Sequence, residues 1–347
     1  MKTFKNLMCV KITWFIILAF SALCGQGKVI GTVFTNWCYD FTDNPSISKK
    51  SAFDVSRAHL GYKHELNKNF TAEVLFDVER TYALTNVAVD PTSIKTTSKK
   101  DERYEAFLKF ANLEWRNPLP YTTLRFGLIP MLQFFLQERK WGYRYIYNSF
   151  MDAYNYGPSC DLGITAKIKP LDKAQINFMF SHGEGLKKSQ DADGLYKTAL
   201  GLEMYPIPAI TMYLYGDYMP SKYDGHDSTA TITAAGFAGY EKKEAFKVGF
   251  EFNSQWNQKG IEAHDVKGIS TYGTYFLSEK FAVFARVDMS VSKNDWNIEK
   301  DGIGIINGIE YSPIKNVRIA IDYQGFLWED ERSISRHKGF INVEVGF

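Results

Sequence analysis

The feature that most constrains the fold of this chain is an alternation of apolar and polar residues, repeated from residue 28 to the end. Residues 246–253 read Phe-Lys-Val-Gly-Phe-Glu-Phe-Asn, and residues 317–324 read Val-Arg-Ile-Ala-Ile-Asp-Tyr-Gln. Successive side chains of a β-strand point to opposite faces, so each such segment has one apolar and one more polar face. The pattern therefore predicts an all-β chain whose strands separate an apolar from a polar environment.

About sixteen segments show this pattern, and short turns mostly alternate with longer loops between them. Asn112 and Glu114 interrupt the alternation of the fourth segment. An even strand number with this rhythm of connections is typical of a transmembrane, antiparallel, up-and-down β-barrel. The segments lie near residues 28–41, 51–64, 69–82, 103–115, 121–130, 158–169, 173–182, 195–206, 209–219, 228–240, 245–256, 266–277, 280–291, 302–312, 316–327 and 333–347.

Soluble β-sandwiches and propellers also alternate, so strand length and the aromatic residues must decide between the two classes. The segments are about 10–13 residues long, which suits a tilted crossing of an apolar band of about 25 Å, whereas soluble strands average about 5–6 residues. Aromatic residues make up 16% of the chain and gather beside the short turns, as at Tyr62, Phe70, Trp115 and Tyr121. Such rings settle at the headgroup level of a bilayer, which favours the barrel.

The N-terminus has the pattern of a secretory signal peptide. Lys2, Lys5 and Lys11 precede a short apolar run, residues 12–20, and the small residues Ser21 and Ala22 follow. We expect a signal peptide over residues 1–26 and a barrel over residues 27–347. Without these three lysines, 38 of the 41 basic residues remain against 39 acidic residues, so the net charge does not indicate a nucleic-acid partner.

A barrel of about sixteen strands is too wide to be filled by its own wall, and it leaves an aqueous channel. A charged side chain that faces lipid costs about 2–4 kcal/mol at the midplane, so the polar face is expected inside. The wall residues that we expect to line the lumen are Arg57, Asp77, Glu79, Arg125, Lys167, Arg286, Asp288, Arg318 and Asp322.

The long loop over residues 130–157 is rich in aromatic residues, and exposing that much apolar surface to water is costly. We therefore expect it to fold into the lumen, with helical turns, and to narrow it. Glu138, Arg139, Lys140 and Arg144 would then lie at the constriction, where a ring of charges selects ions. In the alternative, the loop packs on the wall and only stiffens the barrel.

Residues 141–152, Trp-Gly-Tyr-Arg-Tyr-Ile-Tyr-Asn-Ser-Phe-Met-Asp, and residues 157–163, Gly-Pro-Ser-Cys-Asp-Leu-Gly, resemble porin-like proteins of Bacteroidota outer membranes. Residues 53–62 and 104–115 match the same group, and the chain is more distantly similar to the phosphate-selective porin O/P family. The resemblance implies a passive channel for small polar solutes or ions, embedded in outer-membrane lipids, with porin precedent suggesting a homotrimer. The terminal Phe347 resembles the signal read by the barrel-assembly machinery.

No catalytic residue, cofactor or metal site is expected. The six histidines lack the spacing of metal ligands. His226-Asp-Ser228 brings together the residue types of a catalytic triad, but neighbours on one loop cannot adopt its geometry. Two alternatives to a non-enzymatic porin stay open, namely a barrel that serves as a ligand-binding or adhesion protein and an outer-membrane hydrolase.

Overall fold

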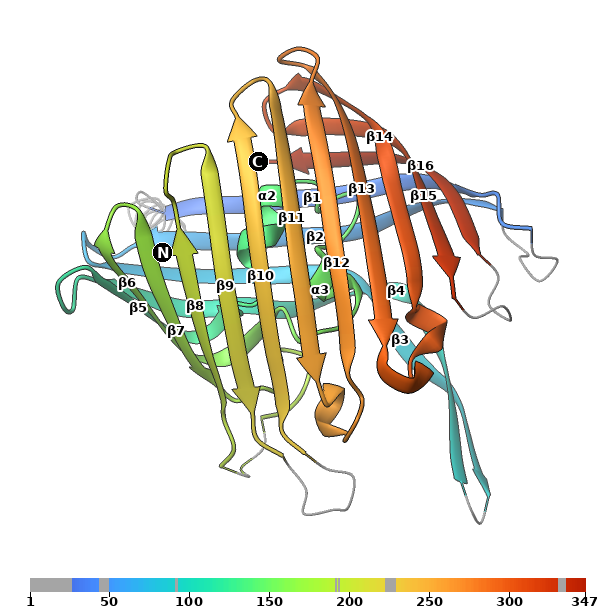
Figure 1. Ribbon diagram of the computed structural model, residues 1–347, viewed down its shortest axis with the longest axis horizontal. Helices are drawn as coiled ribbons and strands as arrows, with labels where there is room; N and C mark the ends of the chain where they lie inside the picture. The colour runs from blue at the N-terminus through green and yellow to red at the C-terminus, as the bar shows by residue number, and fades with distance from the viewer. Residues whose placement is uncertain are drawn as a thin grey trace, which may run out of the picture.

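Sixteen antiparallel strands form a closed barrel in which β1 pairs with β16, which confirms the predicted fold class (Figure 1). The computed structural model describes residues 27–43, 50–90, 93–190, 192, 194–221, 229–329 and 335–347, so the predicted signal peptide lies outside them. The strands are β1 Gly27–Asp40, β2 Ser51–Glu65, β3 Phe70–Asp90, β4 Ser93–Arg116, β5 Thr122–Pro130, β6 Cys160–Leu171, β7 Ala174–Ser181, β8 Lys197–Met204, β9 Ile210–Met219, β10 Thr231–Lys242, β11 Phe246–Trp256, β12 Val266–Phe276, β13 Phe281–Ser292, β14 Gly302–Ile314, β15 Val317–Trp328 and β16 Arg336–Gly346.

The two ends of the barrel differ in their connections. Short turns, such as residues 172–173 and 315–316, join strands at the end that also holds Phe347, which we call the short-turn end. The longer loops, including 131–159 and 182–196, leave from the opposite end, which we call the long-loop end.

The prediction of a long loop over residues 83–102 was wrong. There β3 and β4 continue as a paired ribbon up to Asp90 and Ser93, and the ribbon projects beyond the rest of the barrel (Figure 1). Pairing of β2 with β3 stops at Ala58 and Val78, so the ribbon pairs only with itself. The segment combines Thr and Val, which favour extended backbone, with Lys, Ser and Asp, and its residue types do not alternate throughout.

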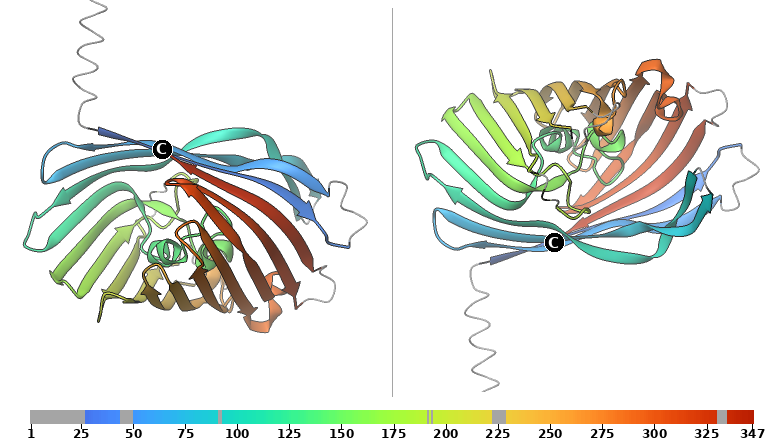
Figure 2. Two further views of the ribbon diagram at one scale, coloured as in Figure 1. Left: turned by 90° about the horizontal axis from the view of Figure 1, so that it is seen from above. Right: turned by 90° about the horizontal axis from the view of Figure 1, so that it is seen from below.

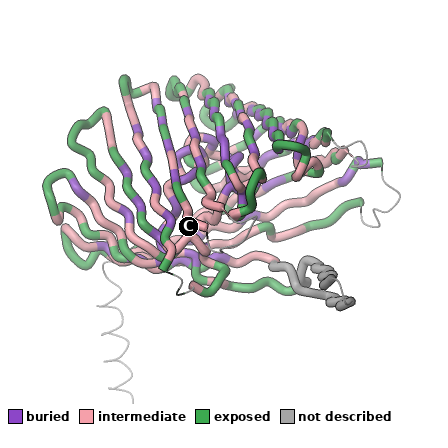
Figure 3. Tube along the Cα trace, turned by 60° about the horizontal axis from the view of Figure 1, so that its bottom comes forward, coloured by how far each residue is buried: buried purple, intermediate pink, exposed green. Residues whose placement is uncertain are grey.

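The wall is apolar outside and polar inside. On β11, Val248, Phe250 and Phe252 are exposed on the outer face, whereas Glu251 and Asn253 point inward and are buried. The same alternation of buried and exposed positions runs along most strands (Figure 3). The usual arrangement of a globular protein is therefore reversed in the wall.

A β-bulge changes the phase of this alternation on β4. Leu75 pairs with Phe110 and Phe76 pairs with Leu108, so Lys109 is the extra residue. Bulges commonly redirect a side chain, and here the Lys109 ammonium lies 2.8 Å from the carboxylate of inward-facing Asp77. Because the phase changes, Asn112, which interrupted the alternation in the sequence, is also buried inside.

The hydrophobic core lies inside the barrel and is built around the loop between β5 and β6. This loop contains α2, Phe135–Trp141, and α3, Phe150–Ala153, and it lies within the ring of strands (Figure 2). The indole ring of Trp141 is 1% exposed and lies 5.2 Å from the ring of Tyr272. No helix in the described part of the chain is long and apolar enough to span a membrane.

Candidate functional site

The inner loop is hydrogen-bonded mainly to one half of the wall, from β9 to β15. A loop cannot satisfy its own backbone by regular secondary structure, so side chains of the wall supply the missing donors. Its carbonyl oxygens accept hydrogen bonds from five inward-facing side chains of β11, β13 and β15. These bonds join Lys247 to Trp141 at 2.7 Å, Gln255 to Tyr156 at 2.6 Å, Arg286 to Asn148 at 2.7 Å, Arg318 to Gly142 at 2.7 Å and Gln324 to Ile146 at 3.3 Å.

Four of the predicted wall residues lie on this half. Arg286 and Asp288 form a bidentate pair with both contacts at 2.8 Å, and each side chain is 1% exposed. Asp322 is also buried. Arg318 pairs with Glu310 at 2.6 Å and with Glu344 at 2.9 Å. Arg286 and Arg318 therefore anchor the loop directly, whereas Asp288 and Asp322 accept hydrogen bonds from Arg286 and Gln324, the side chains that bond to it.

The opposite half of the wall carries a charge network that solvent can reach. Arg57 contacts Glu79 at 2.5 Å and Asp77 at 3.6 Å. Lys109 and His59 both approach the other oxygen of Asp77, at 2.8 and 3.3 Å. The side chains of Arg57 and Glu79 are 19% and 15% exposed, whereas those of Asp77 and Lys109 are buried, so only the Arg57 and Glu79 part of the network borders solvent.

A second charge network lies on the loop. The Arg144 guanidinium contacts Glu138 at 2.8 Å and Asp152 at 3.2 Å. Burial raises the pKa of Glu138 above its ordinary value, although the pair with Arg144 opposes this shift. Glu138 lies within electrostatic reach of the wall cations Lys109 and Arg57. The loop thus presents acidic groups towards a part of the wall that carries basic groups.

The four predicted constriction residues do not form one ring. Glu138 and Arg144 lie together, whereas Lys140 points to Glu241 on β10, with 3.7 Å between the charged atoms. Arg139 is exposed on α2. Arg125 and Lys167, the remaining predicted wall residues, lie on β5 and β6 towards the short-turn end, where Arg125 contacts Glu114 at 2.6 Å.

Sequence reasoning missed Lys109 and Asp152. Lys109 is the extra residue of the bulge, where the alternation of residue types loses its phase, so the sequence pattern did not single it out. Asp152 lies in α3 and contacts Arg144. The two residues are eight positions apart and meet only because the loop doubles back, so the sequence gave little indication of this contact.

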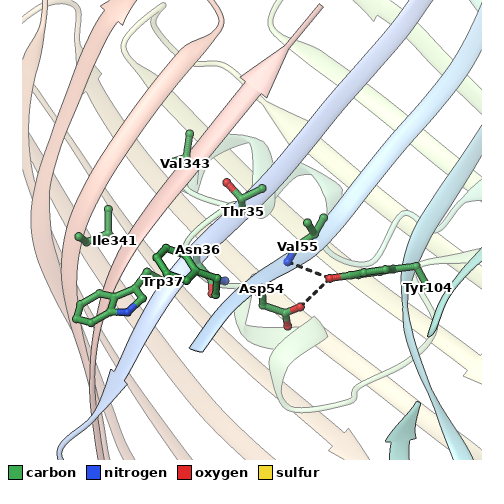
Figure 4. A pocket seen from close by; sticks show the side chains of 9 residues that line it. Thr35, Asn36, Trp37, Asp54, Val55, Tyr104, Ile341 and Val343 are labelled. Carbon is green, nitrogen blue, oxygen red and sulfur yellow. Dashed lines mark hydrogen bonds between the residues drawn. The ribbon is translucent and has the colours of Figure 1, made fainter. Parts of the chain in front are cut away.

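Hollows also lie away from the charge networks. At the long-loop end, a hollow of about 770 Å³ is lined by Tyr156 of the loop and by Lys188, Lys197 and Lys259. On the outer wall, a hollow of about 620 Å³ is lined mainly by apolar side chains of β1, β2 and β16 (Figure 4). Its polar edge is the Tyr104 hydroxyl, which accepts the Val55 N–H and donates to Asp54 (Figure 4). The apolar hollow faces away from the lumen and is no part of a polar solute path.

Within the described residues, no group of three or more His, Cys, Asp or Glu side chains is arranged to hold a metal ion. Residues 226–228, which carry the triad residue types, lie outside the described part.

No family model matches this chain, and no curated protein matches it. Solved structures do share its fold. OmpF of Salmonella typhi, in a complex with daunomycin, superposes with a TM-score of 0.65 at 12% identity, over 92% of this chain and 97% of that one. The outer-membrane channel DcaP of Acinetobacter baumannii gives 0.60 at 10% identity, with the same two coverages. A mutant of the Rh. blastica porin gives 0.57 at 12%, over 92% and 100%. The chain thus has the sixteen-stranded fold of outer-membrane porins.

Proposed function

We propose that this protein is an outer-membrane porin, a passive channel for small hydrophilic solutes or ions. The observation that carries the proposal is the loop inside the lumen, whose Glu138 and Asp152 lie within electrostatic reach of Arg57 in the part-exposed wall network. Fixed charges of both signs at a narrowing select among permeating ions. The loop over residues 130–157 acts as the constriction in this proposal.

The apolar outer face supports a location in outer-membrane lipid, with the short-turn end towards the periplasm. In this proposal, residues 1–26 direct export, and Phe347 is recognised by the barrel-assembly machinery. The resemblance to Bacteroidota porin-like proteins and porin precedent for a trimer belong to the same proposal. N-terminal sequencing of the mature protein from outer-membrane fractions tests the export signal.

Conductance of the purified, refolded protein in planar bilayers tests the channel. We expect discrete current steps and a reversal potential, measured in a salt gradient, that depends on the two charge networks. Arg57→Gln and Asp152→Asn should move the reversal potential in opposite directions, because they remove charges of opposite sign. Lys140→Gln is the matched control, since Lys140 pairs with Glu241 away from both networks.

Absence of steps, together with absence of solute uptake by proteoliposomes, would overturn the channel proposal. Those results would favour a ligand-binding or adhesion barrel. Ester hydrolysis by the refolded protein would favour the hydrolase instead. An unchanged reversal potential in both charge variants would leave a channel but remove these networks from its constriction.

A further inference from the structure

Arg139 and Lys167 are cations in the lumen for which the described part of the chain provides no acidic partner. Within the described part of the chain, no carboxylate oxygen lies within 4.0 Å of the charged atoms of Arg139 or Lys167. By contrast, Arg125 pairs with Glu114, and Lys140 pairs with Glu241. Lys167 is half-buried, and a partly buried charge without a counter-ion is costly for a protein, whereas Arg139 is exposed to the lumen. An unpaired cation at either position marks a place that favours an anion.

The strand register brings Lys167 and Arg125 together. Lys167 lies opposite Thr123 of β5 and Asn177 of β7, and Arg125 is two residues beyond Thr123 on the same strand. Diagonal neighbours on one face of a sheet lie about 7–8 Å apart, within reach of long side chains. The charges that act most strongly on Lys167 are Arg125, Glu203 and Arg139. Three cations from β5, β6 and α2 therefore share one region of the lumen.

A group of hydrogen-bonding side chains adjoins these cations on β7 and β8. Glu203 accepts hydrogen bonds from Gln175 at 3.2 Å, from Asn177 at 3.0 Å and from the Tyr205 hydroxyl. The Gln175 amide also donates to Asn177 at 2.7 Å. An amide and a carboxylate can each make further hydrogen bonds, and together they suit the hydroxyl groups of a solute.

The charge balance distinguishes between kinds of anion. Glu203 stands among the cations and would repel a second negative charge on a solute. A monoanion that carries hydroxyl groups would use both halves of the region, with its carboxylate on the cations and its hydroxyls on Glu203 and the amides. Charge-assisted hydrogen bonds to Arg and Lys are the strong contacts in such an arrangement.

We propose that Arg125, Arg139 and Lys167, with Glu203, Gln175 and Asn177, form a binding step for a small hydroxylated carboxylate, such as a sugar acid. The step lies between the constriction and the short-turn end, and it deepens the proposed channel function on which it rests. Solutes that pass the loop would pause there before they leave the barrel.

The test is single-channel recording of the full mature protein with sodium gluconate as the probe. Glucose, which lacks the charge, and propionate, which lacks the hydroxyls, are the control solutes. We expect gluconate to interrupt the current at lower concentration than either control. R139Q and K167Q should each weaken the gluconate block about tenfold, as expected for loss of one charge-assisted contact. K140Q, on the same helix as Arg139 but paired with Glu241, should leave it unchanged.

E203Q separates this binding step from simple electrostatic attraction. It should reduce the preference for gluconate over propionate, because both solutes keep their carboxylate. Heat-modifiable gel migration identical to that of the unmodified protein establishes that each variant is folded. Current steps that gluconate does not block, or a block equally affected by K140Q, would overturn the binding step while leaving the channel standing. Absence of any steps would instead overturn the proposed function.

Discussion

Arg286→Met is the substitution that most directly tests how the inner loop is held. Arg286 is enclosed by the loop and the wall, and its guanidinium makes two contacts of 2.8 Å with Asp288 and one of 2.7 Å with the Asn148 carbonyl. Methionine keeps much of the side-chain volume but removes the charge and all three donors. Asp288 would remain as a buried, uncompensated carboxylate.

The expected cost follows from those contacts. Removing one member of a buried ion pair costs about 3–5 kcal/mol, and a carbonyl that loses its donor adds about 1 kcal/mol. We therefore expect Arg286→Met to lower the free energy of unfolding by about 4–6 kcal/mol. The double variant Arg286→Met with Asp288→Leu should lose clearly less, because no buried charge is left behind.

Urea-induced unfolding of the barrel in lipid vesicles, followed by tryptophan fluorescence, gives these free energies. Arg318→Met is the matched control, since the side chains of Arg318 and Glu344 are 27% and 24% exposed, and the buried Glu310 keeps its hydrogen bond from the Tyr145 hydroxyl. The reasoning would be refuted if Arg286→Met cost no more than the double variant, or no more than Arg318→Met.

Three further predictions concern the loop and the outer wall. Trp141→Ala should cost about 3–5 kcal/mol in the same urea assay, because it empties the best-packed position of the inner core; a loss below about 1 kcal/mol would contradict that packing. Burial raises the pKa of Glu138, so the folded protein binds the proton of this carboxyl group more tightly than the unfolded chain does. The contribution of Glu138 to stability is therefore full below its ordinary pKa and declines as pH rises through the raised pKa. In urea titrations between about pH 4 and 7, the free energy of unfolding should fall less with rising pH for Glu138→Gln than for the unmodified protein. An equal fall in both proteins would show that Glu138 is not the titrating group. Tyr104→Phe leaves the Val55 N–H without its partner and should cost about 1–2 kcal/mol, seen as a lower midpoint of heat-modifiable gel migration, whereas an unchanged midpoint would show that the N–H finds another acceptor.

Much of the barrel could be predicted from the sequence because a wall between lipid-like and watery surroundings imposes a period of two. On β11 and β15 the residue type indicates whether a side chain points outward or into the barrel, as with Phe250 outside and Glu251 inside. The projecting ribbon of β3 and β4 could not be predicted in this way, because its residue types do not alternate throughout. Its composition therefore resembles that of a loop, although its backbone is paired up to Asp90.

The candidate site was less accessible to sequence reasoning, because contacts between the loop and the wall join residues far apart in the chain. An aromatic, charged loop predicted that Glu138 and Arg144 would matter, but nothing in the order of residues says that Arg139 and Lys140 point in different directions. That division follows from where α2 packs, which depends on partners such as Tyr272 on β12. Likewise, Arg286 and Arg57 look alike in the sequence, and only the position of the loop makes one an anchor and the other solvent-accessible.

The inner loop also bears on how the ring can close. Closure joins β1 to β16, the two ends of the chain, and bringing such distant segments together carries the largest loop-closure entropy of any strand pair in this fold. The loop touches both sides of that seam. The ring of Tyr145 lies 6.4 Å from Phe34 on β1, and the carbonyl of the next residue, Ile146, accepts a hydrogen bond from Gln324 on β15. A segment that lies inside the finished barrel can therefore also serve as an internal support near which the first and last strands meet.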